Sequence, residues 1–286
     1  MEYNDNQPRA SLIIAFYNNI ELLELVFKAL NEQTEKNFEL VIADDGSKKE
    51  VVDHIKNRIE NLPFPVQHVW HEDKGFRKNR ILNKAVIASK SDYLIFLDGD
   101  CIPEAHFVED HLSESSRGYA LNGRRVDLSE KYSRLLKSHK NPATFFTEFK
   151  WSILKDYIFS GGGQKEKGRN IEKGFRILNP TLRRMIIPKD KGLVGCNFSL
   201  FKDDLLKING FDMRYEAPGV GEDSDLDYRW LLAGFKKNSL FYKATQLHCY
   251  HPILERSSKN DDIYNAMKSQ NSPKAQLGIQ ELKREK

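Results

Sequence analysis

The first hundred residues alternate between two hydrophobic periodicities. Short apolar runs, each ending at polar or acidic residues, occupy positions 11–16, 38–43, 66–70 and 93–97. Segments with apolar side chains three and four positions apart lie between these runs, at positions 20–33, 51–59 and 77–88. The runs are typical of buried parallel strands, and the spacing between them is that of amphipathic helices. The pattern predicts an α/β fold, a mostly parallel sheet with helices on both faces.

The remainder of the chain is less regular. Pro103 suits the first turn of a short helix that ends near residue 111, because proline lacks the N–H that is unpaired there. The other elements that we expect are strands at 119–122, at 193–201 and within 241–250, and a helix at 221–233. The tail from about residue 257 is polar and charged, which predicts a peripheral helix or partial disorder.

Composition narrows the class of protein. The chain has 286 residues, of which 40% are hydrophobic and 11% aromatic, enough for a sizeable core. It contains no apolar run of the roughly 18 to 20 residues that span a bilayer, and residues 1–10 lack the apolar core of a signal peptide. Cys101, Cys196 and Cys249 are too far apart for a zinc pair and odd in number for a disulfide framework. These features predict a reducing, cytoplasmic location.

The charge is unevenly distributed. The formal net charge of +4 does not suggest a nucleic-acid coat. Residues 131–191, here called the basic segment, nevertheless carry 15 basic and 5 acidic residues, whereas the rest of the chain carries 30 basic and 36 acidic residues. Aromatic residues are interleaved with these charges. The basic segment is either a helical lid with a solvated basic face, a site for an acidic polysaccharide, or an attachment to an anionic membrane surface.

Two acidic turns follow predicted strands. Asp98 and Asp100 flank Gly99, and a divalent cation would relieve the repulsion between the carboxylates while leaving coordination positions open. Asp44 and Asp45 have the same placement, and one of them could accept a hydrogen bond from a nucleobase while the other forms the turn. Each turn taken alone is also compatible with an ordinary surface turn. Ligands of parallel sheets bind at the carboxyl ends of the strands, which favours a site here.

Three further groups of residues are candidates for chemistry. Glu222, Asp223 and Asp225 begin a predicted helix, where acids favour the helix dipole, but a cap does not need three of them. A general base is the functional alternative. His248 and His251, three positions apart, either satisfy local hydrogen bonds or join a carboxylate pair in a Mn²⁺ site. The basic cluster at 74–80 enters a helix and is either a phosphate-binding N-terminus or a solvated face.

In this order, the motifs resemble those of family-2 glycosyltransferases, which have the Rossmann-like GT-A fold. The matching positions are 11–18 (opening strand and Tyr-Asn turn), 40–47 (nucleoside element), 97–100 (metal motif), and 209–212 with 221–223 (acceptor block). Arg80, Asn83 and Ala85 fall where the family has its Ala-Arg-Asn-x-Gly helix, with Asn83 in place of the usual glycine. The acceptor block and the two histidines are also similar to those of β-1,4-galactosyltransferases and of chondroitin-polymerase-type enzymes.

The resemblance implies an inverting, metal-dependent transfer of a sugar from a UDP-sugar to a hydroxyl of a glycan or lipid-linked glycan in cell-surface polysaccharide synthesis. It implies that Asp223 is the catalytic base and that Glu222 orients the acceptor. The implied nucleotide-sugar contacts are Ala15, Tyr17, Asp44 or Asp45, Arg80, Asp98 and Gly99. The implied ligands of Mn²⁺ (or Mg²⁺) are Asp100 and His251, with Asp98 and His248 as further candidates. Residues 195–199 would line the donor or acceptor pocket.

The same reasoning predicts how the chain is organised. We expect one GT-A domain at 1–256, consisting of a nucleotide-binding half at 1–125, an insertion at 131–191 and an acceptor half at 192–256. A polar tail at 257–286 follows. Through the insertion the protein would attach peripherally to the inner face of a membrane, and no nucleic-acid partner is expected.

Two other classes compete with this interpretation. One is a catalytically inactive module that binds a nucleotide-sugar or a polyanion, against which the complete set of acidic and histidine motifs argues. The other is a nucleotidyltransferase, which would need a glycine-rich phosphate loop after the first strand. Residues 16–19 contain no glycine.

Overall fold

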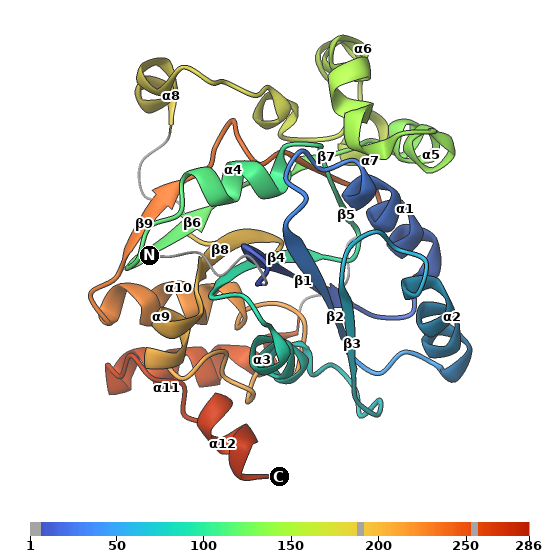
Figure 1. Cartoon of the computed structure of the whole chain (residues 1–286). Coiled ribbons are helices and arrows are strands. Elements are labelled where there is room, and N and C mark those ends of the chain that lie inside the picture. Colours follow the sequence, from blue (N-terminus) through green and yellow to red (C-terminus); the bar gives the residue numbers. More distant parts are fainter. Residues whose placement is uncertain (1–6, 188–191, 253–256, 286) are drawn as a thin grey trace.

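A seven-stranded sheet forms the central layer of the protein (Figure 1). The computed structural model describes residues 7–187, 192–252 and 257–285. The sheet has the strand order β3-β2-β1-β4-β8-β6-β9. Its strands are β1 (Ala10–Phe16), β2 (Phe38–Asp44), β3 (Val66–Trp70), β4 (Tyr93–Asp98), β6 (Tyr119–Asn122), β8 (Asn197–Phe201) and β9 (Lys236–Ser239). Strands β1 to β4 are mutually parallel, as predicted, and β8 runs antiparallel to both of its neighbours.

Helices cover both faces of this sheet, because successive side chains of a buried strand point to opposite sides. Along β1, Leu12 and Ile14 enter one hydrophobic core and Ile13 enters the other. The first core contains α1 (Ile20–Asn31), α2 (Lys49–Ile59) and α4 (Phe107–Ser113). The second contains α3 (Lys78–Ala88), α9 (Lys202–Lys207) and α10 (Asp223–Leu232).

A smaller three-stranded sheet carries the histidine pair to the end of β4. It consists of β5 (Cys101–Pro103), β10 (Gln246–His248) and β7 (Val126–Asp127), in the order β5-β10-β7. His248 pairs with Cys101 across β10 and β5 and with Asp127 across β10 and β7. The prediction of Pro103 in a first helical turn was therefore wrong: Pro103 ends β5, and the helix begins four residues later.

The basic segment is largely helical as far as the structure describes it. Its elements are α5 (Glu130–Ser138), η1 (Pro142–Thr144), α6 (Phe145–Phe159), α7 (Gln164–Lys167), η2 (Ile171–Gly174) and α8 (Pro180–Ile186). The predicted end of the segment, at 188–191, and the first six residues of the chain lie outside the described residues. None of the described helices is long and apolar enough to cross a bilayer.

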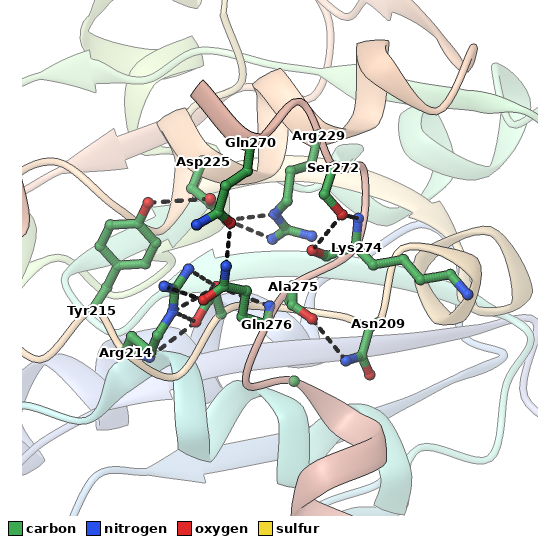
Figure 2. Close-up of polar contacts among 12 residues, drawn as sticks. Asn209, Arg214, Tyr215, Asp225, Arg229, Gln270, Ser272, Lys274, Ala275 and Gln276 are labelled. Atoms are coloured by element: carbon green, nitrogen blue, oxygen red, sulfur yellow. Dashed lines mark hydrogen bonds and ion pairs between the residues drawn. The ribbon is translucent and has the colours of Figure 1, made fainter. Parts of the chain in front are cut away.

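The C-terminal segment packs against the fold beside α3 and α10. It contains η3 (Ser258–Asn260), α11 (Asp261–Gln270) and α12 (Ile279–Arg284). Asn209 donates a hydrogen bond to the carbonyl of Ala275 over 3.0 Å, and the N–H of Gln276 donates to Asp212 Oδ2 (Figure 2). Ile279 is buried in the second core. The tail is helical, which was one of the two expectations, and it also contacts Asn209 and Asp212 of the acceptor block.

Candidate active site

A cavity of about 500 Å³ lies at the carboxyl ends of β1, β2 and β4. The sheet register produces it, because Ala15 is paired with Asp98 and Phe16 with Asp44. The predicted site residues that line this cavity are Ala15, Tyr17, Asp45, Asp98, Gly99 and Asp100. Residues from two acidic turns and from the first strand therefore meet at one hollow, which the sequence pattern led us to expect.

The two carboxylates after β2 have different surroundings. Asp44 is fully buried; it accepts a hydrogen bond from the Ser47 N–H over 2.8 Å and lies 2.9 Å from His68 Nε2. Asp45 reaches the cavity, lies 2.7 Å from His71 Nε2 and accepts from the backbone N–H of Arg77. Asp44 therefore forms the turn, and Asp45 is the one of the two that faces a ligand.

The turn after β4 brings the backbone close to β1. The Gly99 N–H donates to the Ala15 carbonyl over 2.8 Å, and a Cβ at position 99 would stand only 3.0 Å from that oxygen. Glycine makes this close approach possible without a shift of the Ala15 carbonyl. Tyr17, half exposed, donates from its hydroxyl to Asp73 over 3.0 Å at the mouth of the same cavity.

The cation in the cavity is Lys78, whereas Arg80 lies elsewhere. Lys78 Nζ lies 2.7 Å from Asp98 Oδ1 and 2.7 Å from Glu222 Oε1. Burial lowers the pKa of Lys78, but the two carboxylates outweigh that effect and hold it well above the usual value. Arg80 forms an ion pair with Glu285 after α12 and does not line the cavity. Lys78 therefore lines the cavity and Arg80 does not, and the nucleotide contact of Arg80 stays a prediction that its position does not support.

Asp100, His248 and His251 form a group that could hold a metal ion. Their ligand atoms all lie within 4.8 Å of one another, and Asp100 Oδ2 lies 3.3 Å from His248 Nε2 and 3.4 Å from His251 Nε2. Two imidazole nitrogens and a carboxylate suit Mn²⁺ and leave further coordination positions open. Asp98 forms an ion pair with Lys78 and is not part of this group.

Asp127 supports this group from behind. Its Oδ1 lies 3.1 Å from His248 Nδ1, so the other ring nitrogen is directed toward Asp100. Burial lowers the pKa of His248, but the nearby carboxylates of Asp100 and Asp127 outweigh it and raise the pKa to about 9. The two carboxylates therefore demand positive charge at this point, which a proton or a cation can supply. Sequence reasoning missed Asp127, since only strand pairing brings it to His248.

The acidic block at the start of α10 is connected to the cavity through the contact of Glu222 with Lys78, and Asp223 is not among the residues that line the cavity. Asp223 accepts from the Ser224 N–H over 2.7 Å and from the Gly195 N–H over 3.3 Å, so backbone donors hold both of its oxygens. A Cβ at position 195 would stand 2.6 Å from Glu222 Oε1, which explains the glycine there. Burial raises the pKa of Glu222 to about 7; Asp98 and Asp223 add to this effect, and Lys78 opposes it.

Asp225, the third acid of the block, has a structural role. It is fully buried, pairs with Arg229 and accepts from the Tyr215 hydroxyl over 3.2 Å (Figure 2). Arg229 in turn donates to the carbonyls of Ile208 and Gly210. This network ties α10 to the loop that precedes the acidic block.

A second hollow, of about 200 Å³, adjoins the first. It is lined by Phe76, Lys78, Asn79, Tyr215, Ala217, Pro218, Gly219 and Glu222, and it shares Phe76 and Lys78 with the larger cavity. Phe76 keeps 38% of its surface exposed, so it offers an aromatic face to a ligand. The bridge from Lys78 to Glu222 therefore stands between two neighbouring hollows.

Residues 195–199 do not line either hollow. Asn197 and Ser199 are buried, and both contact the ring of His111. Phe198 stacks on Phe96 in the second core. Within this stretch, Gly195 is the residue that reaches the acidic block, so the predicted pocket-lining role is wrong for Asn197 to Ser199.

Comparison with known proteins places this site in a family. Residues 11–207, more than half of the chain, match the model of glycosyl transferase family 2. The chain belongs to glycosyl transferase family 2. Residues 188–253 of this glycosyltransferase also match the model described as the N-terminal domain of galactosyltransferase. Both matches agree with the predicted resemblance.

Several characterised relatives are bacterial. The glycosyltransferase is 30% identical over 232 residues to a chondroitin synthase of Pasteurella multocida and 26% identical over 227 residues to one of Escherichia coli. These matches cover 78% and 77% of this chain but only 23% and 32% of the relatives' own length. A GalNAc(5)-diNAcBac-PP-undecaprenol beta-1,3-glucosyltransferase of Campylobacter jejuni is 24% identical, with 82% of each chain covered.

Solved structures confirm the GT-A fold. GalNAc-T7 with UDP, GalNAc and Mn²⁺ has a TM-score of 0.59 at 16% identity, covering 93% of this chain and 48% of the other. The mannosyltransferase PcManGT of Pyrobaculum calidifontis, in complex with GDP-Man and Mn²⁺, has a TM-score of 0.55 at 13% identity. That similarity covers 92% of this chain and 69% of the other.

Proposed function

We propose that this family-2 enzyme transfers a sugar from a UDP-sugar to a hydroxyl of a glycan or lipid-linked glycan, in a single metal-dependent displacement that inverts the anomeric centre. The observation that carries the proposal is that a candidate metal site, a cavity and the acidic block lie next to one another. The group of Asp100, His248 and His251 borders the cavity, and the Lys78–Glu222 bridge joins that cavity to the acidic block. Named relatives that make polysaccharide or extend an undecaprenol-linked glycan support the acceptor class.

In this proposal the nucleoside half of the donor occupies the cavity beside Tyr17 and Asp45. Tyr17 supplies an aromatic ring at the mouth, and Asp45 supplies a carboxylate that can accept from a base N–H. Gly99 lines the cavity with no side chain, which leaves room for the ligand there.

The departing nucleotide carries negative charge, and the chain offers positive charge at two points. Asp100, His248 and His251 fit Mn²⁺ by ligand type, and a bound ion there would neutralise diphosphate oxygens. Lys78 stands on the floor of the same cavity and can turn from its carboxylates toward a phosphate. Such prepositioned charge lowers the barrier to leaving-group departure.

The acceptor enters from the smaller hollow in this scheme. Phe76 provides a face on which a sugar ring can stack, and Glu222 provides a carboxylate for its hydroxyls. Asp223, oriented by the N–H groups of Gly195 and Ser224, removes the proton from the attacking hydroxyl. The chain then acts as one GT-A unit in which the basic segment is an insertion.

A donor panel tests the proposal. UDP release is measured for several UDP-sugars with Mn²⁺ and with chelator, each with and without glycan acceptors. We expect at least one donor to be turned over only when Mn²⁺ is present. Tight UDP–Mn²⁺ binding with no turnover of any donor would favour the alternative, an inactive nucleotide-sugar-binding module.

A further inference from the structure

Large hydrophobic side chains are exposed on one part of the basic segment. Among the described residues, 13 large hydrophobic side chains are exposed, and seven of them lie between 151 and 186. These seven, here called the apolar face, are Trp151, Ile158, Phe159, Leu178, Leu182, Met185 and Ile186. The helices α6 and α8 that carry most of them project from the same side of the molecule (Figure 1).

Helix α6 is apolar on two sides. Phe145, Phe146 and Ile153 are buried in the first core, which fixes the helix to the body of the protein. Ile158 and Phe159, in its last turn, are 60% and 78% exposed. The buried side of α6 is satisfied by the protein core, whereas water does not provide an apolar environment for the exposed side chains of its last turn.

Helix α8 buries a charged side chain and exposes apolar ones, which is the opposite of what is usual for a surface helix. Arg183 points inward, is only 8% exposed and lies 2.7 Å from Glu114. Leu182 and Met185 point outward and are 49% and 79% exposed. The Arg183 side chain thus attaches α8 to the protein, and the side chains of Leu182 and Met185 remain exposed and can contact a partner.

Unpaired cations accompany the apolar face. Lys155 on α6 and Arg184 on α8 are exposed, and neither forms an ion pair with a residue that the structure describes. The surrounding basic segment has 15 basic and 5 acidic residues. Two identical copies of such a surface would repel each other, and an acidic polysaccharide would leave the aliphatic side chains in water. An anionic bilayer matches both the exposed cations and the exposed apolar side chains, because its phosphate headgroups are negatively charged and its acyl chains are apolar.

We propose that the apolar face docks onto an anionic lipid surface, with the end of α6 and the outer side of α8 inserted at the boundary between headgroups and acyl chains. Lys155 and Arg184 contact the lipid phosphates. Binding needs neither donor nor metal, so it can be tested apart from the proposed transfer; where the acceptor is lipid-linked, docking also brings the active site to its substrate.

Vesicle flotation tests this directly. The full chain is mixed with vesicles of phosphatidylcholine alone or with phosphatidylglycerol, at low and high salt, without nucleotide. We expect flotation with phosphatidylglycerol that weakens at high salt. The double variant Ile158→Ser/Phe159→Ser should reduce the bound fraction about tenfold or more. The double variant Lys155→Gln/Arg184→Gln should reduce it about fivefold for each charge removed.

Leu231→Ser, at an exposed leucine outside the apolar face, is the matched control and should float like the wild type. Circular dichroism and size-exclusion chromatography check that each variant is folded. The proposal is overturned if the wild type does not float, or if the Ile158/Phe159 variant floats as well as the control. It is also overturned if the wild type is dimeric and that variant monomeric, because a second copy would then be the occupant.

Discussion

Lys78 Nζ lies 2.7 Å from Glu222 Oε1, and this contact joins two residues that are 144 positions apart in the chain. The same ammonium group contacts Asp98 at 2.7 Å. One positive charge therefore holds a carboxylate of the metal motif and a carboxylate of the acceptor block at a fixed separation. In the proposed reaction, this bridge links the donor side to the acceptor side before Lys78 turns toward the phosphate.

Removing the ammonium group should destabilise the fold measurably. Lys78→Met leaves two carboxylates facing each other without compensation, so we expect the free energy of unfolding to fall by about 3–5 kcal/mol. Urea denaturation at pH 8, above the pKa of about 7 of Glu222, measures this change. The double variant Lys78→Met/Glu222→Gln should recover most of the loss. Equal losses in the single and double variants would mean that the ammonium group does not balance these acids.

The metal group should depend on its ligands and on the residue behind them. We expect His251→Ala to weaken Mn²⁺ binding at least about tenfold, and Asp127→Asn to weaken it about 10- to 100-fold because His248 loses its orientation. Isothermal titration calorimetry with Mn²⁺ measures both. His106→Ala, at a partly exposed histidine paired with Glu109, should bind as the wild type does. Unchanged affinity in His251→Ala would contradict the assignment.

Glu104 should make stability depend on pH. It accepts from the Phe146 N–H over 2.8 Å at the start of α6, and burial raises its pKa from 4.5 to about 7. The native state therefore holds a proton that the unfolded state releases above pH 4.5. This contribution is full below pH 4.5 and is lost as pH rises to about 7, by at most about 3 kcal/mol. Urea denaturation from pH 5 to 8 should show a smaller slope in Glu104→Gln than in the wild type, because Glu222 and His248, whose pKa values are also raised, still contribute in the variant. Glu172→Gln, at an exposed residue, should keep the wild-type slope; a wild-type slope in Glu104→Gln would refute the prediction.

The C-terminal segment should be part of the cooperative fold. Ile279 packs against Gly210, where an added Cβ would stand 2.7 Å from the Ile279 side chain. Ile279→Ala should lower the free energy of unfolding by about 2–5 kcal/mol. Leu277→Ala, at a residue that is 36% exposed, should lower it by less than about 1 kcal/mol. Similar small losses in both variants would show that this segment is only loosely attached.

The sequence was informative where a local rule sets the structure. The apolar runs identified the strands, and the carboxyl ends of parallel strands meet at one edge, so the acids at 44–45 and 98–100 could be placed together. The choice between Asp44 and Asp45 needed the phase of the strand, since successive side chains alternate. The choice between Lys78 and Arg80 needed the phase of the helix. Lys78 shares a face with Ile81 and Leu82, and Arg80 lies on the opposite side.

Other features depend on contacts that no local pattern contains. Asp127 reaches His248 only because β7 pairs with β10. Gly195 approaches Glu222 through the turn before β8. The segment after residue 257 is polar on average, and its few buried side chains, Ile279 among them, become evident only once packed. The cytoplasmic location stays a prediction.

The most direct test compares the wild type with Asp223→Asn, using a donor that the panel identifies and a glycan acceptor. Two quantities are measured for each protein: the rate of UDP release and the affinity for UDP with Mn²⁺. The account predicts that Asp223→Asn loses transfer by about 100-fold or more while its affinity for UDP–Mn²⁺ stays within about twofold of the wild type. Wild-type transfer rates in Asp223→Asn would contradict the assignment of the base and, with it, the proposed mechanism.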